Sequence, residues 1–177
     1  LPEDQKIRAV SISAAPSGSG TPFTKNNSSW DSAYSRAIKT GLIIIDCTQN
    51  YGITSPCYYD IENPDTISKC LPGYPDIPYK ADSTRICVPN SRRTVAEQYK
   101  SGKYSFTYWG RGGISWAEPC LIGVLALGWQ LRPDISGHEM IRLLHSTSYI
   151  YKNEVKIIQP KMFIDSVKEY PMDKAKE

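Results

Sequence analysis

The stretch Gly112-Gly113-Ile114-Ser115-Trp116-Ala117-Glu118-Pro119 decides the fold, together with the apolar run 120–129 that follows it. Two adjacent glycines let the backbone turn tightly, and a serine then stands at the start of a helix, where unpaired N–H groups point outward. Proline is tolerated only near a helix start, so Pro119 keeps that start close to Ser115. The stretch therefore predicts a serine in a position suited to nucleophilic attack.

The apolar run 120–129 has no polar face, which is typical of a helix buried on all sides. A run of roughly a dozen apolar residues is well short of the ~20 needed to cross a bilayer, so we predict a central core helix and no membrane span. A simpler interpretation of Ser115 is that it only caps this helix in a tight turn.

The composition is that of one domain, or a large piece of one, at 177 residues. The net charge of +3 comes from 21 basic and 18 acidic residues that form no basic block or stripe. The electrostatic signature of a nucleic-acid-binding protein is therefore missing.

The cysteines are five in number, so they cannot all pair, and they lack the close spacing of a zinc site. Cys47 and Cys120 lie in apolar runs and are expected to be buried thiols. Cys57, Cys70 and Cys87 lie in or beside a loop, where one bridge can form in an oxidising compartment. The sequence leaves the compartment open.

The N-terminal third has the pattern of a βαβ unit. Residues 6–13 and 42–47 are predicted strands, the second a continuous β-branched run typical of a strand covered on both faces. Between them, residues 30–40 are predicted to form a helix capped by Ser28 or Ser29, with one face made of Trp30, Ala33, Tyr34, Ala37 and Ile38. Because ligands collect beyond the carboxyl ends of parallel strands, residues 14–17 and 48–52 should form one functional edge.

The segment 53–84 is rich in proline, tyrosine, asparagine and aspartate and has no periodicity, so we predict an irregular, insertion-like loop. After it, residues 85–89 and 104–109 are predicted strands, and residues 90–94 a turn. Ser136-Gly137-His138-Glu139 predicts a capped helix, and Gln159-Pro160 begins a last helix before a frayed tail, 170–177.

The stretch 113–119 resembles the Gly-Thr-Ser-Met-Ala-x-Pro signature around the nucleophilic serine of subtilisin-like serine proteases (subtilases). The matching residues are Gly113, Ser115, Ala117 and Pro119. Ile114 and Trp116 depart from the signature.

A second resemblance lies at the end of the predicted strand 42–47. Subtilases have here a strand that ends in Ala-Gly-Asn, whose asparagine donates a hydrogen bond to the oxyanion; Asn50 takes its place, with Gln49 where glycine is usual. Without the family, Asn50 would be read as a turn residue. The resemblance implies that the cleft binds substrate through Ser13, Ala14, Ala15, Pro16, Cys47, Thr48 and Gln49.

The resemblance implies an α/β fold with a three-layer parallel sheet and helices on both faces. Residues 1–177 would be the C-terminal part of a catalytic domain that hydrolyses peptide bonds. Ser115 would attack the peptide carbonyl, and the Asn50 amide and the Ser115 N–H would stabilise the oxyanion. The resemblance implies no organic cofactor; members of the family bind calcium, but no calcium or other metal site can be read from the sequence.

Two catalytic groups of the family have no counterpart in the sequence. The Asp-x-Gly and His-Gly-Thr-His motifs that hold the orienting aspartate and the base are absent, so we expect them upstream of residue 1 and expect the chain alone to be inactive. His138 and His145 both lie on the predicted capped helix, and we expect neither to be the base. The expected partners are a peptide or protein substrate and a segment or chain that carries the missing residues and packs beside strand 6–13.

Two other functions stay open from the sequence. One is a subtilase relative without catalysis, a pseudoprotease that binds a peptide or partner in the cleft; Gln49, Ile114 and Trp116 favour it. The other is an unrelated α/β binding module in which Ser115 is only a cap.

Overall fold

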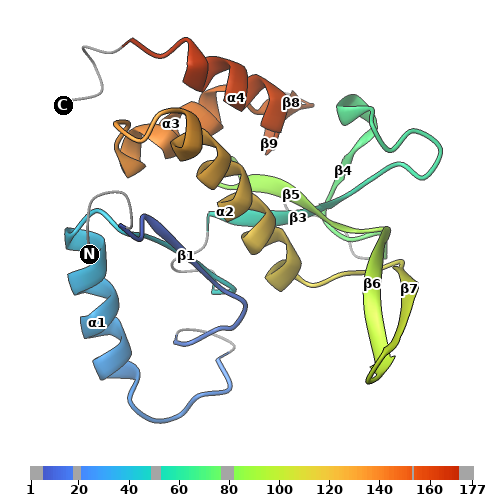
Figure 1. Ribbon diagram of the computed structural model, residues 1–177, viewed down its shortest axis with the longest axis horizontal. Helices are drawn as coiled ribbons and strands as arrows, with labels where there is room; N and C mark the ends of the chain where they lie inside the picture. Colours follow the sequence, from blue (N-terminus) through green and yellow to red (C-terminus); the bar gives the residue numbers. More distant parts are fainter. Residues whose placement is uncertain (1–5, 18–20, 49–52, 77–81, 153, 172–177) are drawn as a thin grey trace.

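The computed structural model describes residues 6–17, 21–48, 53–76, 82–152 and 154–171. In this part of the chain it combines four α-helices with a five-stranded mixed β-sheet and two two-stranded sheets, which confirms the predicted α/β class (Figure 1).

The predicted βαβ unit is confirmed. Strands β1 (Ala9–Ile12) and β2 (Ile43–Asp46) run parallel, with Ala9 opposite Ile43, and helix α1 (Asn27–Lys39) connects them. The N-cap of α1 is Asn26, in the left-handed conformation at φ 63°, and not Ser28 or Ser29. Asparagine adopts this conformation more readily than other non-glycine residues, which moves the helix start upstream of the prediction.

The face that the sequence predicts for α1 is only partly covered, with Trp30, Tyr34 and Ala37 half-buried and Ala33 exposed. No residue of α1 is buried, and Ile38 is 42% exposed. The helix touches the described chain mainly through β2.

The main sheet has the strand order β4-β3-β5-β9-β8. Its three inner strands, β3 (Thr54–Tyr58), β5 (Ile86–Ser91) and β9 (Val155–Ile157), are parallel. The edge strands β4 (Leu71–Pro72) and β8 (Tyr149–Tyr151) run antiparallel, so the sheet is mixed rather than parallel throughout.

Two secondary-structure predictions are wrong. The segment 53–84 is not irregular, because it contains the sheet strands β3 and β4 and a 3₁₀ helix at Ile67–Lys69. The predicted turn at 90–94 is also wrong: Asn90 and Ser91 end β5, the chain bends at Arg92 with φ 56°, and β6 begins at Arg93. Both errors have one cause, which is that tertiary pairing imposes strand structure on residues with low intrinsic strand propensity.

A long antiparallel hairpin follows β5. Its strands are β6 (Arg93–Lys100) and β7 (Lys103–Trp109), and it extends away from the body of the chain (Figure 1). Tyr104 and Phe106 are each 80% exposed on it. The C-terminal end of β7, at Trp109, leads directly into the glycines that precede Ser115.

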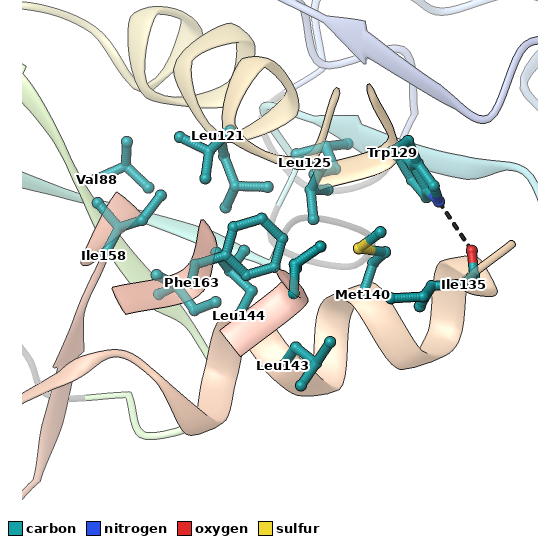
Figure 2. Close-up of a cluster of buried hydrophobic side chains, with 14 of the residues drawn as sticks. Val88, Leu121, Leu125, Trp129, Ile135, Met140, Leu143, Leu144, Ile158 and Phe163 are labelled. Atoms are coloured by element: carbon teal, nitrogen blue, oxygen red, sulfur yellow. Dashed lines mark hydrogen bonds between the residues drawn. The ribbon is translucent and has the colours of Figure 1, made fainter. Parts of the chain in front are cut away.

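Helix α2 (Ile114–Leu131) lies against β1, β3 and β5 and forms the centre of the core. Its residues Leu121 and Leu125 are fully buried and pack with Phe163 and Leu144 of the two C-terminal helices (Figure 2). At the far end, the Trp129 indole N–H donates to the Ile135 carbonyl at 3.0 Å. By length and composition α2 would pass as a membrane span, but these contacts make it a core helix.

The prediction that α2 is buried on all sides is wrong. Leu127 is 50% exposed and Leu131 is 44% exposed, and both lie on the side turned away from the core. An exposed apolar surface of this kind is typical of a site where another segment or protein packs.

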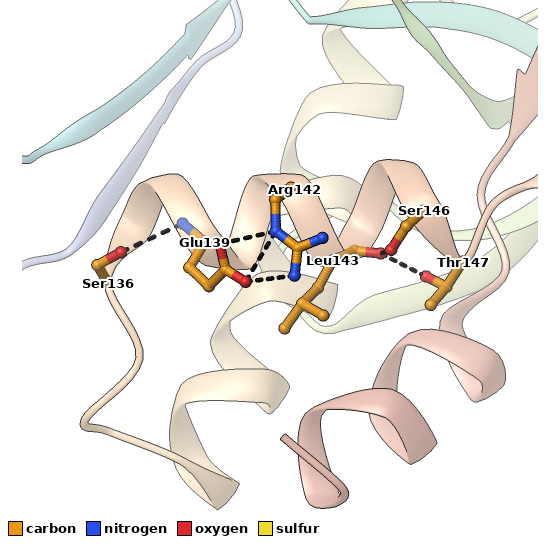
Figure 3. A network of polar contacts seen from close by, with 6 residues as sticks. All are labelled: Ser136, Glu139, Arg142, Leu143, Ser146 and Thr147. Carbon is orange, nitrogen blue, oxygen red and sulfur yellow. Dashed lines mark hydrogen bonds and ion pairs between the residues drawn. The ribbon is translucent and has the colours of Figure 1, made fainter. Parts of the chain in front are cut away.

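The two C-terminal helices confirm their predicted start signals. Helix α3 (Gly137–Ser146) is capped by Ser136, whose hydroxyl accepts from the Glu139 N–H at 3.2 Å, while the Glu139 carboxylate pairs with Arg142 (Figure 3). Helix α4 (Pro160–Lys168) begins at Pro160, as expected from the preference of proline for the first turn.

The contact between α2 and α4 gives a stability prediction. A Cβ on Gly128 would lie 2.9 Å from the buried Phe163 ring, whereas one on Gly123, in the same helix, would meet nothing within 4 Å. Gly128→Ala should therefore lower the free energy of unfolding by about 1–2 kcal/mol, because overpacking outweighs the gain in helix propensity. Urea unfolding measures this, and Gly123→Ala is the control, expected to raise stability by up to about 1 kcal/mol. Equal effects of the two substitutions would contradict the packing.

Candidate active site

Ser115 is the second residue of α2 and is not its N-cap. The cap is Gly113, in an extended conformation and with no side-chain cap bond. The interpretation of Ser115 as a simple helix cap is therefore wrong. Within the described residues, no hydrogen bond to its hydroxyl is present, so that group is available for other chemistry.

The turn before α2 is held by the end of β5. The Gly112 N–H donates to the Ser91 hydroxyl at 3.1 Å, and the Asn90 side-chain amide donates to the Gly113 carbonyl at 3.0 Å. A Cβ on Gly112 would lie 1.8 Å from the Asn90 carbonyl oxygen, so only glycine fits there. Both Asn90 and Ser91 are fully buried. They position Ser115, and sequence reasoning missed them because Asn-Ser is a common turn sequence.

Pro119 frees a hydrogen-bond acceptor on Ser115. In a regular α-helix the N–H of residue 119 would donate to the carbonyl of residue 115, but proline has no N–H. The Ser13 hydroxyl donates to that carbonyl at 3.0 Å. The bond joins the end of β1 to the first turn of α2, and it depends on the proline of the Ser115 stretch.

The ends of β1 and β2 are also joined to each other. The Cys47 N–H donates to the Ala14 carbonyl at 2.9 Å, and the Asp46 carboxylate accepts from the Thr48 N–H at 2.8 Å and from its hydroxyl at 2.6 Å. These contacts place both strand ends beside the start of α2. The end of β2 and the start of α2 border a cavity of about 710 Å³ whose lining includes Asp46, Cys47, Thr48, Thr54, Tyr74 and Ile114.

The structure thus brings together several of the predicted site residues. Ser13, Ala14, Cys47, Thr48 and Ser115 converge at this edge of the fold. Ala15 and Pro16 continue the same loop and are half-buried. Of the predicted site residues that the structure describes, only Cys47 and Thr48 line the cavity itself. Gln49 and Asn50 lie outside the described residues, so the role of Asn50 as oxyanion donor stays a prediction.

Two acidic side chains are buried next to this edge. Glu118 is 0% exposed and Asp46 is 1% exposed. Both Glu118 carboxylate oxygens and the Asp46 Oδ2 atom have no partner of ordinary hydrogen-bond geometry among the described residues. Sequence reasoning missed Glu118, because it took this position of the Ser115 stretch as variable.

Burial raises the pKa of Glu118 to about 7, and repulsion by Asp46 adds to the shift, while the nearby Cys47 thiol, a weak donor, opposes it only in part. The pKa of Cys47 rises to about 12, chiefly through burial and then through its contact with Glu118. Cys47 therefore stays a neutral thiol, and Glu118 changes its charge near neutral pH.

The histidines lie elsewhere. His138 is exposed, and His145 is half-buried on α3 with its Nδ1 atom 3.3 Å from the Lys156 ammonium. Burial, and then the Lys156 charge, lowers the pKa of His145. In the described chain neither histidine is hydrogen-bonded to Ser115, and no group of three or more His, Cys, Asp or Glu residues is placed to hold a metal.

The fold is structurally similar to part of the subtilisin-like proteases. The sequence matches no family model and no curated protein. Among solved structures, it is similar to fervidolysin from Fervidobacterium pennivorans, a keratinolytic enzyme related to subtilisin, at a TM-score of 0.55 and 12% identity over 75% of this chain and 24% of that one.

Two further structures give the same result. A protease from Pseudoalteromonas arctica matches with a TM-score of 0.53 and 17% identity, over 85% of this chain and 55% of that one. A chain of the subtilase cytotoxin SubAB assembly matches with a TM-score of 0.52 and 14% identity, over 90% and 58%. The chain therefore spans between a quarter and three fifths of the length of these three relatives. At such identities the likeness shows the fold.

The bond between Ser13 and the Ser115 carbonyl predicts an energetic coupling with Pro119. Ser13→Ala should lower the free energy of unfolding by about 0.5–1.5 kcal/mol, because the carbonyl loses its donor. In a Pro119→Ala background the same substitution should cost less, since the backbone N–H at position 119 then supplies the donor. A double-mutant cycle measured by urea unfolding should give a coupling of about 0.5 kcal/mol or more. Ser101→Ala on the hairpin is the control, and additive effects of Ser13→Ala and Pro119→Ala would contradict the assignment.

The pKa of Glu118 predicts the pH dependence of stability. Between the usual value of 4.5 and the raised value of about 7, the folded state holds a proton that the unfolded state has lost. Stability should therefore fall as pH rises through this window and stay lower above it, by about 1–3 kcal/mol. Glu118→Gln should remove this decline, so the variant should be the more stable form above the window.

Thermal unfolding over a pH series measures the effect. Glu62→Gln, in an exposed loop, is the matched control and should leave the decline in place. An unchanged pH profile in Glu118→Gln would show that Glu118 ionises normally in the folded protein.

Proposed function

We propose that this chain supplies the nucleophile Ser115 and the oxyanion donor Asn50 of a serine endopeptidase with subtilisin-like architecture. The general base and its orienting acid come from residues outside these 177. The reaction is acyl transfer to Ser115, followed by hydrolysis of the acyl-enzyme by water.

The observation that carries the proposal is the junction at Ser115. Its hydroxyl has no partner in the described chain, its carbonyl is bound by Ser13, and the preceding glycine turn is fixed by Asn90. A nucleophilic serine needs such a position, with the backbone held rigidly and the hydroxyl uncommitted. Beside it, the 710 Å³ cavity offers room for a substrate side chain.

Two surfaces support a second segment or chain next to this one. β1 pairs with β2 alone among the described strands, which leaves its other edge open for pairing. Next to β1 and the uncovered side of α2 lies a hollow of about 390 Å³ that is lined largely by apolar residues, among them Ile7, Ala9, Ile122, Ala126 and Trp129. The partial coverage of the longer relatives agrees with this arrangement. The segment that fills this hollow is proposed to carry the missing aspartate and histidine.

A peptide-binding protein without catalysis is the second candidate. Trp116, which departs from the subtilase signature, packs edge-on against Trp109 at 5.8 Å between ring centroids. Trp116 therefore contacts the end of β7, where the hairpin joins the body of the chain. The described chain provides no general base that could take the Ser115 proton. A binding cleft built from the same loops would need neither a base nor a reactive hydroxyl.

Covalent labelling distinguishes the two candidates. A serine-directed fluorophosphonate, applied to the protein extended by its upstream region, should modify Ser115 and stop peptide hydrolysis, because the reagent requires an activated hydroxyl. Ser115→Ala should abolish both labelling and hydrolysis. Peptide mass mapping identifies the modified residue.

The control is Ser101→Ala on the hairpin, which should keep full labelling and hydrolysis. The 177-residue chain alone should label weakly. If the extended protein binds peptides equally well with and without Ser115→Ala and is never labelled, the binding function replaces the catalytic one.

A further inference from the structure

A pair of buried cysteines lies between β3 and β4, away from Ser115. Cys57 is in β3, and Cys70 stands between the 3₁₀ helix Ile67–Lys69 and the edge strand β4. Their sulfur atoms are 3.5 Å apart, and the side chains are 0% and 1% exposed. The Cys70 thiol also lies 3.3 Å from the Tyr58 carbonyl.

We propose that Cys57 and Cys70 are a covalent modification site and are oxidised to a disulfide. A disulfide needs the sulfurs about 2.05 Å apart. The gap to close is small, and Cys70 directly precedes the two-residue edge strand β4, where the backbone can adjust. Cys87 belongs to the same apolar cluster, which makes it the competing partner to be tested.

The oxidation balances with a small-molecule disulfide, such as glutathione disulfide, as the oxidant. The Cys70 thiolate attacks one sulfur of the oxidant, releases a thiolate and forms a mixed disulfide. The Cys57 thiolate then attacks the Cys70 sulfur and releases the second thiolate. The protein loses two electrons and two protons, and the oxidant becomes two thiols.

The local environment supports this order of attack. The hydrogen bond with Cys57 lowers the pKa of Cys70, whereas burial raises the pKa of Cys57. Because the thiolate is the attacking form, Cys70 reacts first. A surface hollow of about 300 Å³ borders Tyr58, Leu71 and Val155, next to the pair, and offers the oxidant an approach when the edge strand opens.

The bridge would strengthen one wall of the 710 Å³ cavity. Pro56 precedes Cys57 and lines that cavity, and its carbonyl accepts from the Gly73 N–H at 2.8 Å. Tyr74, the next residue, lines the cavity as well. A disulfide between positions 57 and 70 therefore ties together the two segments that carry this wall. The bridge does not depend on the proposed peptidase function, since it can be measured on the chain itself.

Thiol counting and peptide mapping test the proposal. The folded chain is treated with glutathione disulfide, denatured, and titrated for thiols; five cysteines should become three thiols, because two are consumed. Trypsin cleaves after Lys69, so the bridge should join the peptide 40–69 to the peptide 70–80. Since Cys47 also lies in 40–69, the map is repeated with Cys47→Ser and should be unchanged.

Thermal unfolding gives an independent readout. The bridge closes a short loop in the unfolded chain, and oxidation should raise the melting temperature by on the order of 5–10 °C. Cys57→Ser and Cys70→Ser should each abolish the shift, whereas Cys87→Ser should keep it. Five thiols remaining after oxidation, or a peptide 86–92 linked to 40–69, would overturn the proposal without any variant having to fold.

Discussion

The hydrogen bond from the Ser13 hydroxyl to the Ser115 carbonyl is the contact on which the site depends. It exists because Pro119 cannot donate to that carbonyl, so an acceptor inside the first helical turn stays open for a donor from elsewhere. The donor comes from the end of β1, more than a hundred positions away in the chain. One proline thus converts a helix start into a junction between two elements.

The same junction fixes the neighbouring groups. Ser13 is followed by Ala14, whose carbonyl receives the Cys47 N–H, so the end of β2 is tied to the end of β1. From the other side, Asn90 and Ser91 hold the glycine turn. The ends of β1 and β2 and the end of β5 in the five-stranded sheet therefore meet at the first turn of α2. The carboxyl ends of parallel strands are the place where ligands bind in α/β folds. This convergence rests on hydrogen bonds to the backbone, most of them made by the polar side chains of Ser13, Asn90 and Ser91.

The sequence predicts the parts of the fold in which local signals and tertiary structure agree. The βαβ unit, the cap at Ser136 and the proline start of α4 are of this kind. It fails where tertiary pairing overrides propensity, as in β3, whose Thr54–Tyr58 has no apolar alternation, and at Asn90, which reads as a turn residue but is buried in a strand. Of the site, Ser115 and the strand-end loops could be predicted from motifs, whereas Asn90 and Ser91 could not, because their function is visible only through contacts distant in sequence.

Helix α2 connects the two properties that distinguish this chain, a buried acid and an uncovered apolar side. Glu118 is buried against Cys47 and Asp46 on the inner face, where a charge is costly, while Leu127 and Leu131 face outward, where apolar surface is costly. Stability would be higher with the opposite arrangement, in which the acid is exposed and the apolar side chains are buried. Both costs fall if a further segment covers the outer side of α2 and if a ligand or proton compensates the charges beside the cavity. Both features therefore support the proposal that a further segment or chain packs against this one.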